Sequence, residues 1–147
     1  MSGMRLLVLA PLVVTVLVCA LPAAAAQPPD PCVLITNVDA STAIGGNPPK
    51  AKAKAVGTSR SCTYTVKKKT MTVQTSRIPT QAAFDKAAKA TKGVVFPMQG
   101  VGAPAYSING TTILAWQNGT QITITFAGVQ PFVATQQALA KTAVGRL

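Results

Sequence analysis

The stretch TTILAWQNGTQITITF, residues 111–126, shows the clearest hairpin pattern in this 147-residue chain. Residues 111–117 and 120–126 flank Asn118-Gly119, and polar and apolar residues alternate over 121–126. Alternation with a period of two is typical of a half-buried strand, and Asn-Gly is the preferred two-residue connection of a β-hairpin. The pattern therefore predicts two antiparallel strands, 111–117 and 120–126, joined by a tight turn.

The register of this hairpin decides the position of Trp116. A two-residue turn pairs Gln117 with Thr120, which places Trp116 and Leu114 on the face opposite the isoleucines, beside threonine and glutamine side chains. Two interpretations stay open for this aromatic residue. Trp116 and Leu114 form a contact for a carbohydrate or a partner, or a helix or the apolar loop 94–98 covers Trp116 in a second small core.

A second hairpin is expected upstream, around three consecutive lysines. Along residues 62–66 and 71–75, the side chains expected on one face alternate with Thr or Gln expected on the other. A four-residue turn over 67–70 would pair Val66 with Met71 and put the apolar side chains of both strands on one face. The opposite face then presents Thr, Gln and Lys.

Helix signals lie before, between and after the hairpins. Thr36 stands three residues before Asp39, the spacing of a capping box, and Thr80 can cap the next helix. Pro131 suits the first turn of the last helix. The three expected helices run from Thr36 to Gly45-Gly46, over 81–91, and from Pro131 to Leu147, the last one burying Phe132, Leu139, Ala143 and Val144.

The remaining segments are expected as loops, apart from one short strand. Residues 47–57 and 93–104 are interrupted by Gly and Pro, and residues 105–108 form a strand that ends at Asn109-Gly110. The predicted fold is α+β, with an antiparallel sheet of about four to five strands, built from two hairpins and packed with about three helices.

The composition excludes several kinds of active site. The chain has no His, and its only acidic residues are Asp30, Asp39 and Asp85, against fourteen Lys and Arg, for a net charge of +11. A His-based triad and a His-ligated zinc site are excluded, and three scattered carboxylates do not make a calcium cage. No catalytic residue, metal ligand or cofactor is predicted, and we do not expect an enzyme.

The first 26 residues are typical of a secretory signal peptide. Arg5 precedes an uncharged apolar run over 6–21, and Ala24-Ala25-Ala26 offers a small-residue cleavage site. Two alternatives stay open. The run is retained as a membrane anchor, or Cys19 is lipidated, although the bulky Val18 before it is atypical of a lipoprotein signal.

The redox state and the domain organisation follow from this leader. Cleavage after Ala26 leaves two cysteines, Cys32 and Cys62, and an even pair in an exported protein indicates one disulfide. A reactive thiol or a metal pair is the alternative, although the chain offers neither His nor a Cys-x-x-Cys spacing. A Pro-rich spacer over 27–31 then leads to a single extracytoplasmic domain over 32–147, either secreted or associated with the cell envelope.

Three lysine clusters predict a basic surface on the exported domain. Removing residues 1–26 subtracts one basic residue and no acid, so the net charge falls only from +11 to +10. The clusters are Lys67-Lys68-Lys69, Lys50/Lys52/Lys54 and Lys86/Lys89/Lys92. Such charge attracts polyanions, so anionic envelope polymers or lipid headgroups are the expected partners, and nucleic acid is not. Membrane attachment requires a retained leader or a lipidated Cys19. The alternative is that the lysines only maintain solubility.

Several short segments together resemble one family. They are Pro31–Thr36, Ser61–Tyr64, Phe84–Ala87, Gly100–Tyr106, Ala138–Lys141 and Arg146-Leu147. With these segments the chain resembles an uncharacterised family of small exported proteins and lipoproteins of actinobacteria, a domain of unknown function, over nearly the whole length after the leader. The resemblance implies an extracytoplasmic domain with its two cysteines paired and no assigned catalytic residues. The chain departs from the family pattern at Ala103-Pro104, where an acid is usual, and at Tyr64, where Trp is frequent.

The preferred hypothesis is a non-catalytic binding or interaction module with a basic surface. The alternatives are a small envelope-associated carrier with an enclosed ligand pocket, an enzyme of unrecognised type, and a mainly structural envelope protein. A cleft that brings Ser and Lys to Asp39 or Asp85 would favour the enzyme. An enclosed pocket would favour the carrier.

Overall fold

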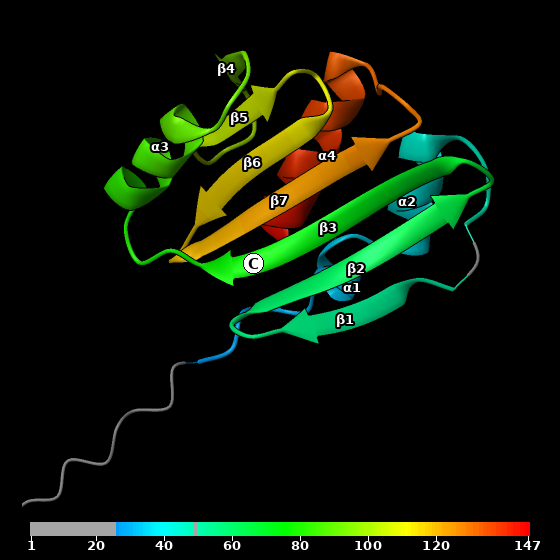
Figure 1. Ribbon diagram of the computed structural model, residues 1–147, viewed down its shortest axis with the longest axis horizontal. Coiled ribbons are helices and arrows are strands. Elements are labelled where there is room, and N and C mark those ends of the chain that lie inside the picture. Colours follow the sequence, from blue (N-terminus) through cyan, green and yellow to red (C-terminus); the bar gives the residue numbers. More distant parts are fainter. Residues whose placement is uncertain (1–25, 49) are drawn as a thin grey trace, which may run out of the picture.

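The computed structural model describes residues 26–48 and 50–147. This part of the chain has four helices, α1 Pro31–Leu34, α2 Asn37–Ile44, α3 Gln81–Ala90 and α4 Val133–Gly145. Its seven strands are β1 Lys52–Val56, β2 Ser59–Val66, β3 Lys69–Arg77, β4 Val95–Pro97, β5 Ala105–Ile108, β6 Thr112–Gln117 and β7 Thr120–Ala127 (Figure 1). The expected leader, with Cys19, lies outside the described residues apart from Ala26.

All strands belong to one antiparallel sheet with the order β1-β2-β3-β7-β6-β5-β4. The predicted α+β class with an antiparallel sheet is confirmed, but the predicted numbers of strands and helices are too low. The missed elements are the two edge strands and the four-residue α1. β1, expected as a loop, is exposed at all five positions, so it lacks the buried face that produces a hydrophobic pattern. β4 has only three residues.

The β6–β7 hairpin has the predicted register. Gln117 pairs with Thr120. Asn118 and Gly119 have φ values of +51° and +74°, as this kind of two-residue turn requires. Because β7 also pairs with β3 along its length, the hairpin occupies the centre of the sheet.

The β2–β3 hairpin corrects the predicted register. Val66 pairs with Lys69 and Tyr64 with Met71, so the four-residue turn and the Val66–Met71 pair are wrong. The turn contains only Lys67-Lys68, and Lys67 adopts a φ of +55°, a left-handed conformation that is rare for lysine. The shift amounts to two residues, so the apolar side chains still share one face.

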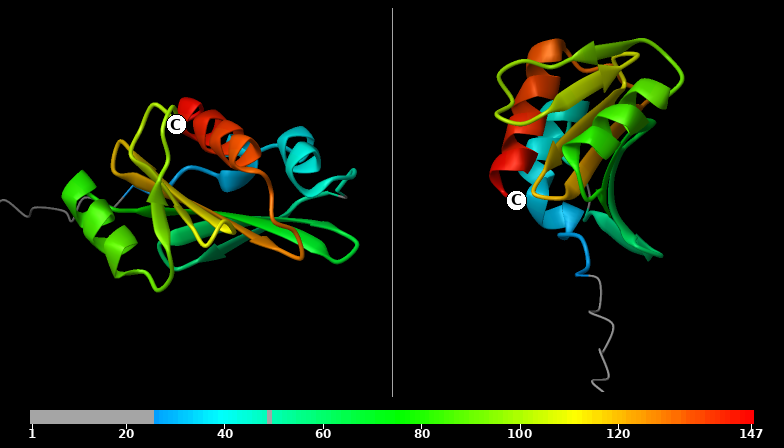
Figure 2. Two further views of the ribbon diagram at one scale, coloured as in Figure 1. Left: turned by 90° about the horizontal axis from the view of Figure 1, so that it is seen from above. Right: turned by 90° about the vertical axis from the view of Figure 1, so that its left-hand side faces the viewer.

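α1, α2 and α4 cover one face of the sheet and enclose the main core (Figure 2). The sheet contributes side chains that are at most 4% exposed, namely Tyr64, Met71, Val73, Ile113, Ile122, Ile124 and Phe126. Leu139, Ala143 and Val144 of α4 are buried as predicted, but Phe132 is 86% exposed. Phe132 is the N-cap residue, so the helical periodicity that buries the others does not extend to it.

α3 lies on the opposite face, over β6, and creates a second, smaller core (Figure 2). Phe84 and Ala88 are completely buried there and pack with Leu114 of β6. Tyr106 stacks beside Phe84, with ring centroids 5.7 Å apart. Its hydroxyl donates a 3.0 Å hydrogen bond to Asp85, and this bond raises the pKa of Tyr106.

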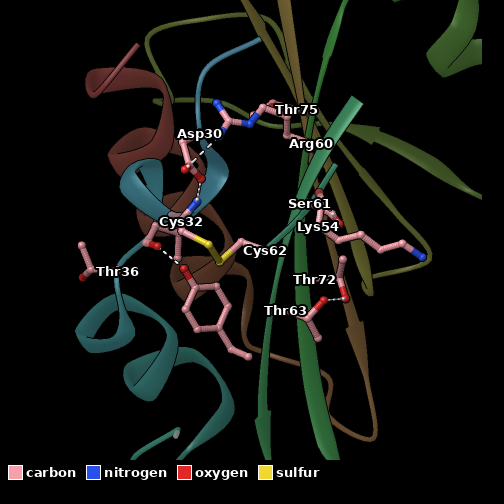
Figure 3. Close-up of a disulfide and its surroundings, with 12 residues drawn as sticks. Asp30, Cys32, Thr36, Lys54, Arg60, Ser61, Cys62, Thr63, Thr72 and Thr75 are labelled. Atoms are coloured by element: carbon pink, nitrogen blue, oxygen red, sulfur yellow. Dashed lines mark hydrogen bonds and ion pairs between the residues drawn. A yellow bond between two sulfur atoms is a disulfide. The ribbon is translucent and has the colours of Figure 1, made fainter. Parts of the chain in front are cut away.

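A disulfide connects α1 to β2. Cys32 and Cys62 are bonded, with Cα atoms 5.2 Å apart, which confirms the predicted pair (Figure 3). Tyr64, further along β2, donates a hydrogen bond from its hydroxyl to the Ile35 carbonyl. Burial raises the pKa of Tyr64 to about 12, and two aspartate charges add to the shift. The disulfide is consistent with an extracytoplasmic location.

The segment expected as a free spacer, 27–31, is held against the sheet. The Arg77 guanidinium donates to the Gln27 carbonyl at 3.3 Å, and the Thr75 hydroxyl donates to the Pro29 carbonyl at 2.7 Å. A proline-rich stretch forms no internal hydrogen bonds, so its carbonyls are free to accept bonds from the domain. Composition alone does not reveal these donors, because both belong to a strand some fifty residues later, at separations of 46 and 50.

Replacing both cysteines by alanine is expected to lower the free energy of unfolding by about 3–4 kcal/mol. The cost arises because the 30-residue separation between Cys32 and Cys62 is no longer closed in the unfolded chain. Urea unfolding followed by circular dichroism measures the loss, and intact mass before and after reduction counts the thiols. A double variant as stable as the parent would contradict the prediction.

Gly128→Ala is expected to destabilise the protein more than Gly57→Ala, by about 2 kcal/mol or more. Both glycines have positive φ, +71° and +57°, so both substitutions incur the left-handed penalty. Only at Gly128 does the added Cβ collide with a backbone atom, the Lys68 carbonyl oxygen, whereas nothing lies within 4 Å at Gly57. Unfolding midpoints of the two variants provide the comparison, and equal losses would contradict it.

Candidate anion-binding surface

The face of the sheet opposite the main core is rich in hydroxyl groups. Along β2, β3 and β7, inward core residues alternate with outward Ser, Thr or Gln. These outward residues, the hydroxyl face, are Ser61, Thr63, Thr65, Thr70, Thr72, Gln74, Thr123 and Thr125. Thr63, Thr72 and Thr125 lie side by side on three strands, and the Oγ1 atoms of Thr63 and Thr72 are 3.4 Å apart (Figure 3).

A groove of about 440 Å³ opens at the β1 end of the hydroxyl face. We call it the lysine groove, and it is lined by Asn47, Lys50, Lys52, Thr63, Thr65, Val66 and Lys67. Three lysines and two threonines therefore line one depression, and none of the lining residues is acidic. Ammonium and hydroxyl groups are donors for anionic oxygens, so the groove can bind phosphate, sulfate or carboxylate groups.

The three lysines of the predicted run Lys67-Lys68-Lys69 lie in different environments. Lys67 lines the lysine groove. The Lys69 Nζ lies 3.5 Å from the position that a Cβ on Gly45 would take, beside the C-terminal end of α2, where a cation is stabilised by the helix dipole. Lys68 is exposed at the turn. Consecutive lysines in a hairpin thus do not act as one patch.

The ion pairs of the described residues involve arginines and no lysines. Within residues 26–48 and 50–147 two ion pairs are present, Arg60–Asp30 at 3.1 Å and Arg146–Asp39 at 2.6 Å. Neither involves a lysine. The ammonium groups of the lysine groove are therefore available to an external anion, and no internal pair has to break first.

Asp39 is the most strongly engaged acid. Its carboxylate accepts hydrogen bonds from the Thr36 backbone N–H at 2.8 Å and from the Arg146 guanidinium at 2.6 Å. Partial burial works against the charged form, but the bonds from Arg146 and Thr36 outweigh it and hold the pKa of Asp39 below its usual value. The capping box predicted at Thr36 and Asp39 is confirmed.

Trp116 and Leu114 lie on the predicted face, beneath α3. Leu114 is 6% exposed. Trp116 is half-buried against the second core, and its indole N–H donates to the Ile78 carbonyl at 2.8 Å. The structure does not bring Trp116 and Leu114 together with the lysine groove, which lies at the opposite end of the sheet, on β1 and β2.

Sequence reasoning missed the groove because it treated 47–57 as a loop. A signal for β1 exists, since lysine and alanine alternate over 50–55. Both residue types are poor strand formers, so propensity favours a loop there. The threonines of β2 were predicted to lie on an outer face, but their meeting with Lys50 and Lys52 depends on the pairing of β1 with β2.

The two carboxylates considered for an enzyme lie apart from the lysine groove. Asp39 binds Thr36 and Arg146, and Asp85 binds Tyr106. Among the hydrogen bonds of the described residues, neither carboxylate is bonded to a serine. In the same part of the chain no cluster of three Cys or Asp side chains is placed to hold a metal ion.

Comparison with known proteins adds no functional assignment. The chain matches no protein-family model, no curated protein and no solved structure. Over residues 26–48 and 50–147, the helices are too short or too polar to cross a membrane.

Asp39→Asn is expected to reduce the loss of unfolding free energy that the protein undergoes as the pH falls. A folded-state pKa below the unfolded value contributes stability above about pH 4, and this contribution is lost as the pH falls through the folded-state pKa. The variant should lose about 0.5–1 kcal/mol less than the parent between pH 6 and pH 2.5 in urea unfolding. Arg146→Gln removes the other member of the Arg146–Asp39 ion pair, so it should also reduce the dependence of the unfolding free energy on pH. An unchanged acid profile in Asp39→Asn would contradict the argument.

Proposed function

We propose that the protein is a non-catalytic extracytoplasmic module that binds anionic polymers of the cell envelope. The observation that supports this proposal is the lysine groove, which is lined by three lysines and two threonines and by no acidic residue. The groove opens onto the hydroxyl face, which continues across β3 and β7. An extended polymer can therefore place one anionic group in the groove and its neighbouring groups along the threonines.

The chemistry of the groove favours a repeated anion over a single small one. Exposed ammonium groups attract anions at long range, but each contact is weak and screened by salt. Several weak contacts along one chain add up through effective concentration. The ligand class is thus a chain bearing phosphate or carboxylate groups. Anionic lipid headgroups present the same chemistry on a membrane surface.

Three further features are compatible with this function. The mature charge of +10 comes from the domain, since the leader contributes only Arg5. The Cys32–Cys62 disulfide is consistent with a location outside the cytoplasm, where such polymers occur. The groove holds donors without a paired base, an arrangement suited to binding and not to proton transfer.

The triple variant Lys50→Gln/Lys52→Gln/Lys67→Gln is expected to bind polyanions about tenfold more weakly or worse. Its dependence of log Kd on log salt should become less steep by about two, because three cation contacts are removed. Isothermal titration with long-chain polyphosphate and with polygalacturonate, at several salt concentrations, measures both quantities. Phosphatidylglycerol vesicles form a third arm, with phosphatidylcholine vesicles as the neutral reference.

The matched control is Lys86→Gln/Lys89→Gln/Lys141→Gln, which removes the same charge from exposed positions outside the groove. The control should keep its affinity within about threefold of the parent. Equal losses in both triple variants would show that net charge and not the groove attracts the polymer. Binding to vesicles but to neither polymer would assign the groove to lipid headgroups.

A further inference from the structure

A second depression lies at the other edge of the sheet, far from the lysine groove in the strand order. It has a volume of about 780 Å³ and is formed by β4, by the turn between β5 and β6, and by the first turn of α4. Figure 1 shows β4 at the edge opposite β1, with the start of α4 close by. A concave site of this size falls within the usual range for small-molecule pockets. We call it the apolar cleft.

Exposed hydrophobic side chains are concentrated in this cleft. Among the described residues seven large hydrophobic side chains are exposed, and four of them line it: Val94, Phe96, Phe132 and Val133. Phe132 and Phe96 are 86% and 57% exposed. Scattered single exposures are ordinary, whereas a cluster that includes two aromatic rings marks a contact site.

Two of the four amide side chains that line the cleft are hydrogen-bonded to other groups of the cleft. Gln136 is 2% exposed; its Oε1 accepts from the Ser107 hydroxyl, and its Nε2 donates to the Gly110 and Pro131 carbonyls. The Asn109 Oδ1 accepts from the Val94 N–H. The buried Gln136 amide is therefore used within the protein, and Gln130 and Gln137 are the other amides that line the cleft.

No ionisable side chain lines the cleft, although the chain is strongly basic. An anionic or cationic ligand would therefore find no partner, and its charge would lose hydration on entry. A second copy of the chain is also disfavoured as the occupant. The edge strand β4 has only three residues and ends in Pro97, which has no N–H to donate, so it is a poor template for strand addition.

We propose that the apolar cleft binds an uncharged small molecule through a hydrocarbon chain or ring placed between Phe96 and Phe132. This site is independent of the lysine groove. The hydrophobic effect supplies the affinity, and the shape set by β4 and α4 supplies the selectivity. Affinity should therefore be insensitive to salt, in contrast to polyanion binding.

The test uses the uncharged probe N-phenyl-1-naphthylamine, whose fluorescence rises in an apolar site, with protein produced from the full-length sequence. The parent should bind one probe molecule saturably, with a Kd unchanged between low and high salt. Phe96→Ser and Phe132→Ser should each raise the Kd about tenfold, whereas Phe132→Leu should stay within about threefold of the parent. Val38→Ser is the matched control, since Val38 is 75% exposed on α2 outside the cleft, and it should leave the Kd unchanged.

Loss of probe binding has to be distinguished from loss of the fold. Phe132 is so exposed that its substitution should leave the fold intact, and circular dichroism verifies this for every variant. Absence of saturable binding by the parent, or an equal loss in Val38→Ser, would overturn the proposal. So would a parent that is dimeric by light scattering and becomes monomeric in Phe132→Ser, because the occupant would then be a second copy. The lysine-groove triple variant should still bind the probe like the parent. The test of the apolar cleft therefore does not depend on whether the lysine groove binds polyanions.

Discussion

The fold depends on the alternation of side chains along β7. This strand hydrogen-bonds to β3 on one side and to β6 on the other, so neither of its edges is free to shift. Its inward residues Ile122, Ile124 and Phe126 are at most 4% exposed, while Thr123 and Thr125 point outward. A slip of one residue would bury hydroxyls beneath the helices and expose isoleucines to water. One strand therefore decides which face receives α1, α2 and α4 and which face receives α3 and the outward threonines.

Arginine and lysine have different roles in this fold. Arg60 binds Asp30 at the start of α1, Arg77 binds the carbonyls that precede α1, and Arg146 joins the end of the chain to α2. A planar guanidinium with several N–H groups suits such multiple contacts. Two of the three aspartates are paired with these arginines, so the acids are used on the helix side. The ion pairs of the described residues involve no lysine, so the lysine charges stay available to solvent or a ligand.

The sequence predicted the elements whose signals are local. The Asn-Gly turn fixed the β6–β7 register, and the Thr36 capping box located α2. It failed where the cause is distant in the chain. β1 exists because β2 offers it a partner. The β2–β3 turn is a local failure, and it is shorter than predicted because Lys67 adopts a positive φ that is rare for lysine. The lysine groove depends on β1 and on this turn, so sequence patterns do not predict it, although all three of its lysines belong to the predicted clusters.

Protection of the sheet edges is an alternative explanation for some of the lysines. Lysines on β1 and Pro97 on β4 are both devices that discourage pairing between the edges of different molecules. Edge protection explains Lys52 and Lys54, which any soluble sheet could place there. It does not explain Lys50, which precedes the strand, or Lys67, whose φ of +55° costs about 1–2 kcal/mol relative to a right-handed conformation. Strain of this kind persists where the surroundings fix it, and Lys67 lines the groove together with two other lysines and two threonines. Protection of the edge therefore leaves Lys50 and Lys67 unexplained, and the anion binding proposed above is consistent with their place in the groove.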